Sequence, residues 1–192
     1  MSKRSNKRKR AREREFEFLC SACGEVHRGP PSVNYDVPPS FDDVPEDARE
    51  RRIALSDDLC HILPPGNEPD GRSAYFIRGV LDVPIVGADE PFRWGVWVSQ
   101  AEETFERYVD TFGEDPTGLK SFGWLLANLP GYRELDEDGA YAWLPCDVDW
   151  GPAGQRPRID VQECDNPIYR EQRDGMSWER AAELVETMMH PD

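Results

Sequence analysis

The residues best suited to chemistry are two cysteines near the N-terminus, Cys20 and Cys23, which are followed directly by Gly24. Two thiolates at this spacing reach one metal ion when the backbone turns tightly between them. The glycine favours such a turn, because it adopts backbone angles that other residues avoid. Thiolates select zinc over calcium or magnesium. The motif therefore predicts a zinc site in a knuckle-like N-terminal segment.

A tetrahedral zinc site needs two more ligands. His27 follows Cys23 by four residues, and Cys60 stands beside His61. The predicted ligand set is Cys20, Cys23, His27 and Cys60, with His61 as the substitute for His27. Four protein ligands make a closed, structural site, whereas a catalytic zinc keeps one position for water. The alternative is that the two N-terminal cysteines are a bare thiol pair.

No catalytic constellation can be assembled around the remaining reactive side chains. The third histidine, His190, falls at the end of the predicted last helix, where a cation interacts well with the helix dipole. Cys146 falls in a predicted strand and Cys164 directly follows one, and both are interpreted as small buried residues. A metal-dependent hydrolase is an alternative, which requires an open zinc position and a carboxylate such as Glu25 or Asp58.

Apolar periodicity predicts the elements that position these residues. Strands are expected over 16–20, 74–81, 93–99, 140–148 and 156–163. Helices are expected over 43–52, 102–112 and 119–128, and a last helix follows the cap residue Ser177. Trp94 and Trp97 fall on opposite faces of one strand, so one is expected in the core and the other nearer the surface. This order predicts an α+β fold, with one domain over 15–192 and a mainly antiparallel sheet covered on one face by helices.

Charge is distributed unevenly along the chain. The segment 1–14 holds eight basic side chains and one acid, a charge of +7, whereas the whole chain carries −15 and the remainder therefore −22. This segment is predicted to be a disordered basic tail, because it offers almost nothing to bury. The acidic remainder repels phosphate backbones and suits a basic protein partner. Nucleic-acid binding through the tail is a second alternative function.

The cellular setting follows from what the sequence does not contain. No stretch has the roughly 20 apolar residues of a membrane span, and no apolar segment follows the basic residues as in a secretory signal. We therefore expect a cytoplasmic protein with reduced cysteines and no membrane association. The sequence specifies no oligomeric state. The predicted function is a non-enzymatic, zinc-stabilised binding or accessory domain that meets another protein.

Five stretches together resemble a known family. They are CSACGEVH at 20–27, SDDLC at 56–60, FIRGVLDVP at 76–84, WGVW at 94–97 and NPIYREQRDG at 166–175. In their order and spacing, from about Phe16 to His190, the chain resembles the bacterial family called domain of unknown function 2199. The family pattern is similar at the four predicted ligands, which supports His27 over His61. The family often has histidine where this chain has Asn166, and the resemblance implies no known activity.

Overall fold

The structure is a computed structural model and describes residues 14–66, 71–111 and 114–190. The predicted basic tail lies outside these residues except for Arg14. The backbone N–H of Arg14 donates a hydrogen bond to the Gly87 carbonyl oxygen (3.2 Å), and its guanidinium lies 4.5 Å from the ring centre of Trp178. Arg14, placed in the tail by composition, thus already contacts the folded part of the chain.

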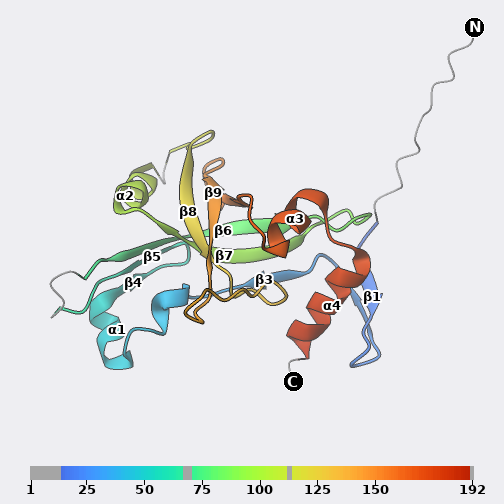
Figure 1. Ribbon diagram of the computed structural model, residues 1–192. Helices are drawn as coiled ribbons and strands as arrows, with labels where there is room; N and C mark the ends of the chain where they lie inside the picture. Colours follow the sequence, from blue (N-terminus) through green and yellow to red (C-terminus); the bar gives the residue numbers. More distant parts are fainter. Residues whose placement is uncertain (1–13, 67–70, 112–113, 191–192) are drawn as a thin grey trace, which may run out of the picture.

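Along the described chain, runs of strands are separated by single helices, and two helices follow the last strand (Figure 1). The strands are β1 (Glu17–Leu19), β2 (Val26–Arg28), β3 (Ser32–Asn34), β4 (Ile53–Leu55), β5 (Leu59–Ile62), β6 (Ala74–Val83), β7 (Phe92–Gln100), β8 (Lys120–Leu126), β9 (Trp143–Asp149) and β10 (Arg158–Val161). The helices are α1 (Glu46–Arg52), α2 (Glu102–Thr111), α3 (Pro167–Asp174) and α4 (Trp178–Met189), with a short 3-10 turn, η1, at Pro39–Phe41. None of these helices combines the length and the apolar character that a membrane span requires.

Five strands close into a small barrel. β6 pairs with β7, β7 with β8, β8 with β9 and β9 with β10, all antiparallel, and β10 returns to β6 in a parallel pairing. The long strands β6 and β7 reach beyond this ring, where β5 and then β4 extend the sheet from β6 and β3 pairs with β7. The predicted mixture of helices and mainly antiparallel sheet is confirmed. The sheet is not a layer covered on one face, however, because its ends meet at β6 and β10.

The first two strands stand apart from this sheet. β1 and β2 form a two-stranded antiparallel hairpin in which each strand is short. Figure 1 shows this hairpin beside α4 at one end of the molecule, with α1, β4 and β5 at the other end. The hairpin is therefore held by contacts other than sheet pairing, which include burial of Phe16 in the main apolar cluster and contacts with α4.

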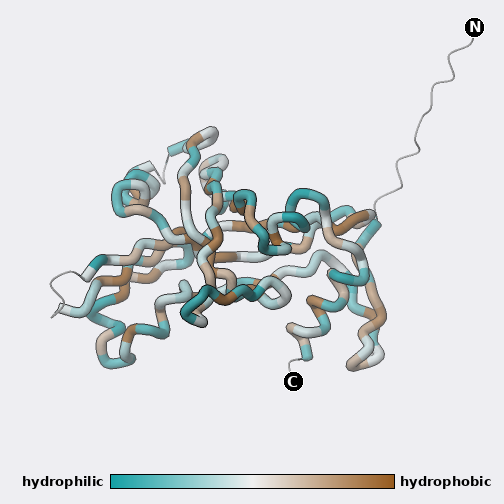
Figure 2. Tube along the Cα trace, in the orientation of Figure 1, coloured by the Kyte–Doolittle hydropathy of each residue, from teal (hydrophilic) through white to brown (hydrophobic). Residues whose placement is uncertain are grey.

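Apolar side chains fill two separate clusters, and both predicted strand tryptophans are buried. Trp94 lies in the main cluster inside the barrel, and Trp97 lies in a smaller one with Val44, Cys60 and Phe76. The prediction that one of the pair lies nearer the surface is wrong, because both faces of the long β6–β7 hairpin are covered. Figure 2 shows the apolar residues along the strands and many hydrophilic residues on α2 and α3.

Several elements differ from the sequence prediction, which contains none of the short strands β2, β3, β4 and β5. The segment predicted as a helix over 119–128 is strand β8, because pairing with β7 and β9 overrides a pattern with apolar residues on both faces. Helix α3 is absent from the prediction. It begins after Asn166, whose side chain accepts a hydrogen bond from the Ile168 backbone N–H (3.1 Å), with Pro167 in the first turn.

Asn166→Ala should lower the free energy of unfolding by about 2–3 kcal/mol, from a lost cap and unpaired buried groups. The Asn166 side chain is 2% exposed, and its amide also donates to the Tyr132 carbonyl oxygen (3.0 Å) and to Glu134 (2.7 Å). Urea unfolding measures the change, with the neighbouring exposed residue as the control in Asp165→Ala. Equal stability of the two variants would contradict this role for Asn166.

Candidate metal centre

The turn between β1 and β2 is built around Cys20 and Gly24. The Cys20 backbone N–H donates to the Glu25 carbonyl oxygen (2.8 Å), and the Gly24 N–H donates back to the Cys20 carbonyl oxygen (3.0 Å). Gly24 has φ of +75°, a conformation that other residues rarely adopt. The two hydrogen bonds fold the chain back on itself. Cys23 is thereby carried over Cys20, and β2 then brings in His27.

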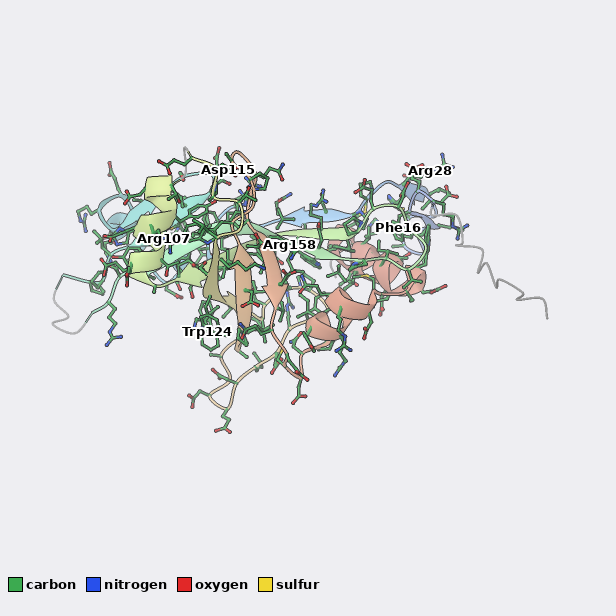
Figure 3. The ribbon with its side chains drawn as sticks, turned by 90° about the horizontal axis from the view of Figure 1, so that it is seen from above. Phe16, Arg28, Arg107, Asp115, Trp124 and Arg158 are labelled. Carbon is green, nitrogen blue, oxygen red and sulfur yellow. The ribbon has the colours of Figure 1, made fainter. Side chains whose placement is uncertain are left out.

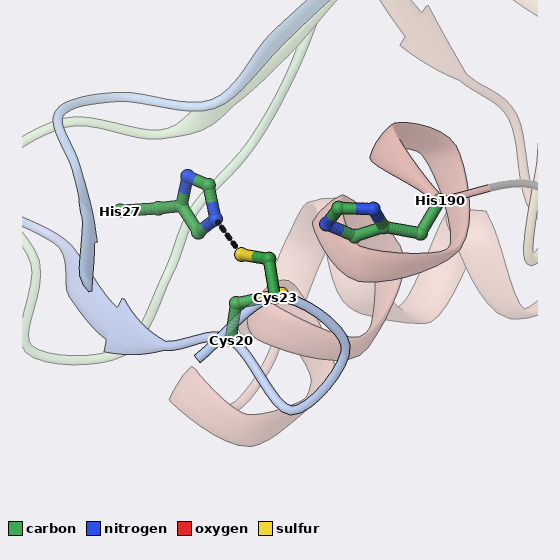
Figure 4. Close-up of side chains that lie close together, drawn as sticks. All are labelled: Cys20, Cys23, His27 and His190. Carbon is green, nitrogen blue, oxygen red and sulfur yellow. Dashed lines mark hydrogen bonds between the residues drawn. The ribbon is translucent and has the colours of Figure 1, made fainter. Parts of the chain in front are cut away.

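Four potential ligand atoms meet at this turn (Figure 4). They belong to Cys20, Cys23, His27 and His190, and all lie within 4.8 Å of one another. The Cys23 sulfur is 3.4 Å from Nε2 of His27. Cys20 is buried, Cys23 is exposed, and the two histidines are intermediate. Two thiolates and two imidazoles in one cluster have the chemistry and the number of ligands for one transition-metal ion.

Helix α4 approaches the hairpin at three positions along its length, and the last of them places His190 in the cluster. In its first turn, the Trp178 indole N–H donates to the Glu17 carbonyl oxygen (2.7 Å). Further along, the Glu186 carboxylate accepts hydrogen bonds from the backbone N–H and the hydroxyl of Ser21. His190 follows as the C-terminal cap residue of the helix. One side of α4 thus spans the hairpin and ends at the cysteines.

The comparison with protein families matches residues 19–176 to a family described as uncharacterized proteins conserved in bacteria, DUF2199. This stretch covers most of the chain and includes Cys20, Cys23 and His27. The chain belongs to the DUF2199 family. The family resemblance seen in the sequence is therefore confirmed, and His190 lies beyond the end of the matched stretch. Searches of curated proteins and of solved structures give no match.

Cys60, the fourth predicted ligand, lies elsewhere in this DUF2199 protein. It is in β5 opposite Phe76 of β6, fully buried in the smaller apolar cluster, and burial raises the pKa of its thiol to about 11. β5 and the hairpin are at opposite ends of the molecule in Figures 1 and 3. His61 also lies in β5 and stacks on Tyr75, with ring centres 4.4 Å apart. The structure brings together three of the four predicted ligands and replaces Cys60 with His190.

The sequence predicts His190 as a cation at a helix end, and the other members of its cluster lie at the opposite end of the chain. A weak signal for a further role is present. Trp178, Glu186 and His190 are separated by eight and four positions, a spacing that places polar groups on one side of a helix next to its apolar stripe. Only the docking of α4 on the hairpin turns this side into part of a site.

The electrostatics of the turn reflect two sulfurs placed close together. The backbone N–H of Glu25 lowers the pKa of Cys23, but desolvation and the neighbouring Cys20 together outweigh it, and the pKa is raised. The hydrogen bonds from Ser21 lower the pKa of Glu186. Glu186 is therefore an ionised carboxylate that is hydrogen-bonded to Ser21, between the two cysteines. A bound divalent cation would favour the thiolate form of both cysteines.

Proposed function

We propose that this DUF2199 protein is a non-enzymatic, cytoplasmic binding domain in which one structural zinc ion joins the N-terminal hairpin to the last helix. The observation that carries this proposal is the cluster of Cys20, Cys23, His27 and His190 within 4.8 Å. Zinc in structural sites prefers four protein ligands of these two types.

The local geometry supports a tetrahedral ion. Zinc binds sulfur at about 2.3 Å and nitrogen at about 2.0–2.1 Å, so two ligand atoms of one tetrahedron lie about 3.5 Å apart. The separation of 3.4 Å between Cys23 Sγ and His27 Nε2 agrees with this value. The ring centre of His27 lies 5.3 Å from that of Phe18, its pairing partner on β1, and this contact helps to orient the imidazole.

The fold gives such an ion a structural task. A two-stranded hairpin of this size is at best marginally stable by itself, and no strand of the main sheet pairs with β1 or β2 in the described residues. A metal held by both the hairpin and His190 closes a loop that contains most of the chain, which restricts the unfolded state. The ion would therefore stabilise the contact between the two ends of the chain.

Three features favour a binding role over catalysis. Four side-chain ligands leave no position for an activated water. Of the two carboxylates suggested for a hydrolase, Asp58 is engaged with Arg156 (2.6 Å), away from the cluster, whereas Glu25 lies in the turn of the hairpin. The acidic charge of the chain beyond its basic tail, −22, suits a basic protein partner.

Elemental analysis of protein purified without chelator tests the proposal, with about one zinc per chain expected. Cobalt substitution then shows the number and type of ligands, because cobalt in a tetrahedral site with two thiolates absorbs strongly in the visible and near-ultraviolet. Absence of metal, or a cobalt spectrum with a bound water, would refute the closed structural site. Turnover of a substrate that depends on the metal would refute the non-enzymatic role.

The alternative of a metal-dependent hydrolase is favoured by one observation. A hollow of about 640 Å³ adjoins the cluster and is lined by His190, Glu186 and Arg133, among others. A water in place of His190 would face this hollow beside a carboxylate. The variant His190→Ala distinguishes the two functions. A hydrolase would keep its zinc and its turnover in this variant, whereas the structural site would lose its zinc.

A further inference from the structure

The outer face of β8 and β9 exposes aromatic side chains of the kind that proteins normally bury. Trp124 is 43% exposed and Trp143 is 40% exposed. Phe122 and Tyr141 add two more partly exposed rings on the same pair of strands or directly before them. Large apolar side chains gathered at one place on a surface mark interaction sites more often than isolated ones do.

Strand register places the two tryptophans side by side. Trp124 pairs with Pro145, so Trp143, two positions from Pro145, is its diagonal neighbour on the same face. Together with Ser99, the residue opposite Trp124 on β7, they line an open hollow of about 380 Å³. Diagonal neighbours of this kind lie about 7–8 Å apart. The result is a trough with an indole on each side.

The Trp124 side of the trough is ordered before any ligand arrives. The Phe122 ring meets Trp124 edge to face, with ring centres 5.1 Å apart. Both strands belong to the closed barrel, and Figure 3 shows Trp124 projecting from the outside of β8, with Arg107 of α2 nearby. A rigid aromatic surface loses little conformational entropy on binding.

A polar groove of about 600 Å³ continues from the trough between β8 and α2. Its positive charges are largely engaged, since Lys120 pairs with Asp149 (3.3 Å) and Arg107 lies 5.7 Å from the ring centre of Trp150. Glu103 of α2 lines the same groove with an exposed carboxylate. The rim of the trough therefore offers one acid, Glu103, beside the cations Lys120 and Arg107 of the same groove.

We infer that the Trp124–Trp143 trough binds a proline-rich peptide with flanking arginines in the polyproline II conformation. Neither indole N–H has a partner among the described residues, so the trough offers donors and flat apolar rings. Proline offers carbonyl acceptors, has no N–H that needs an acceptor, and packs flat on aromatic rings. One turn of a polyproline helix, about 9 Å, is comparable to the separation of the tryptophans.

The charge of the molecule selects between ligand classes. An aromatic trough on strands also suits single-stranded nucleic acid, but the charge of −22 beyond the basic tail repels a phosphate backbone. Arginines beside the prolines are attracted by the same charge. The inference rests on the proposed function, since it names the partner of a binding domain.

The test is a titration of the full-length protein followed by tryptophan fluorescence, with a peptide of about ten prolines preceded by two arginines. Saturable binding is expected, and Trp124→Ala and Trp143→Ala should each weaken it at least tenfold. Val86→Ala, which trims an exposed apolar residue away from the trough, should leave binding unchanged. A peptide with glycine and serine in place of the prolines should bind at least tenfold more weakly.

Three outcomes would overturn the inference: no saturable binding, binding that survives both tryptophan variants, or tryptophan-dependent binding of an oligothymidine or a cello-oligosaccharide but not of the peptide. Zinc content and turnover are measured on the same sample. If the protein holds one zinc, shows no turnover and fails to bind the peptide, only this inference is refuted. If the protein is metal-free or catalytically active, the proposed function is refuted instead.

Discussion

For the zinc site that we propose, His190→Ala should release the metal, whereas Cys60→Ala should retain it. Loss of one of four ligands opens the site, so the ion should no longer stay bound through gel filtration. An ion present at a thousand times its Kd stabilises the fold by about 4 kcal/mol. For a chain of this size, its loss should lower Tm by about 10 °C. Elemental analysis after gel filtration and thermal unfolding with and without chelator measure both effects.

The Cys60 variant is the matched control, because it removes a cysteine of the predicted ligand set from the other end of the molecule. It should lose some stability through a smaller core side chain, but chelator should still lower its Tm as in the wild type. The His190 variant should instead be insensitive to chelator. Zinc retained by His190→Ala and lost by Cys60→Ala would restore the ligand set predicted from sequence and refute the cluster with His190.

The contrast between these residues shows which part of the site is readable from sequence. Cys20, Cys23 and His27 are close neighbours in the chain, so a tight turn and a short hairpin suffice to join them. The prediction of Cys60 depends on its place beside a histidine and an acidic turn. Sheet pairing decides its actual position, and pairing of β5 with β6 points it into the core. His190 needs the docking of a whole helix, which no local pattern encodes.

The same distinction holds for the fold. Strands β6, β7 and β9 are rich in aromatic and branched residues, helix α4 has a clear apolar stripe, and each lies near its predicted position. Strand β8 carries exposed aromatic side chains as well as buried residues, so its pattern is ambiguous between helix and strand. Barrel closure depends on a parallel pairing of β10 with β6, between segments that are far apart in the sequence. Periodicity reports which face is apolar and not which strands meet.

Closure itself depends on a glycine, and Gly79→Val should therefore be severely destabilising. Gly79 lies in β6 where β10 crosses it, and a Cβ added there would lie 2.5 Å from Ile159 Cδ1 and 3.0 Å from the Pro157 carbonyl oxygen. That same carbonyl accepts the hydrogen bond from the Val80 N–H (2.8 Å) that joins the two strands. Ile159 is fully buried and has little room to move. Overpacking should lower the free energy of unfolding by about 3 kcal/mol, measured by urea denaturation.

A graded series separates this steric effect from the general cost of replacing a glycine. Gly79→Ala should cost less than Gly79→Val, because only the first carbon has to be accommodated by a shift of Ile159. Gly66→Ala is the control, since a Cβ there meets no atom within 4 Å and its φ is not positive. That change should be neutral or slightly stabilising, because alanine restricts the unfolded chain. If Gly79→Val unfolds at the urea concentration of the wild type, β10 does not close against β6. The barrel would then have to be open along that edge, because no side chain of this size fits between Gly79 and Ile159 in the closed arrangement.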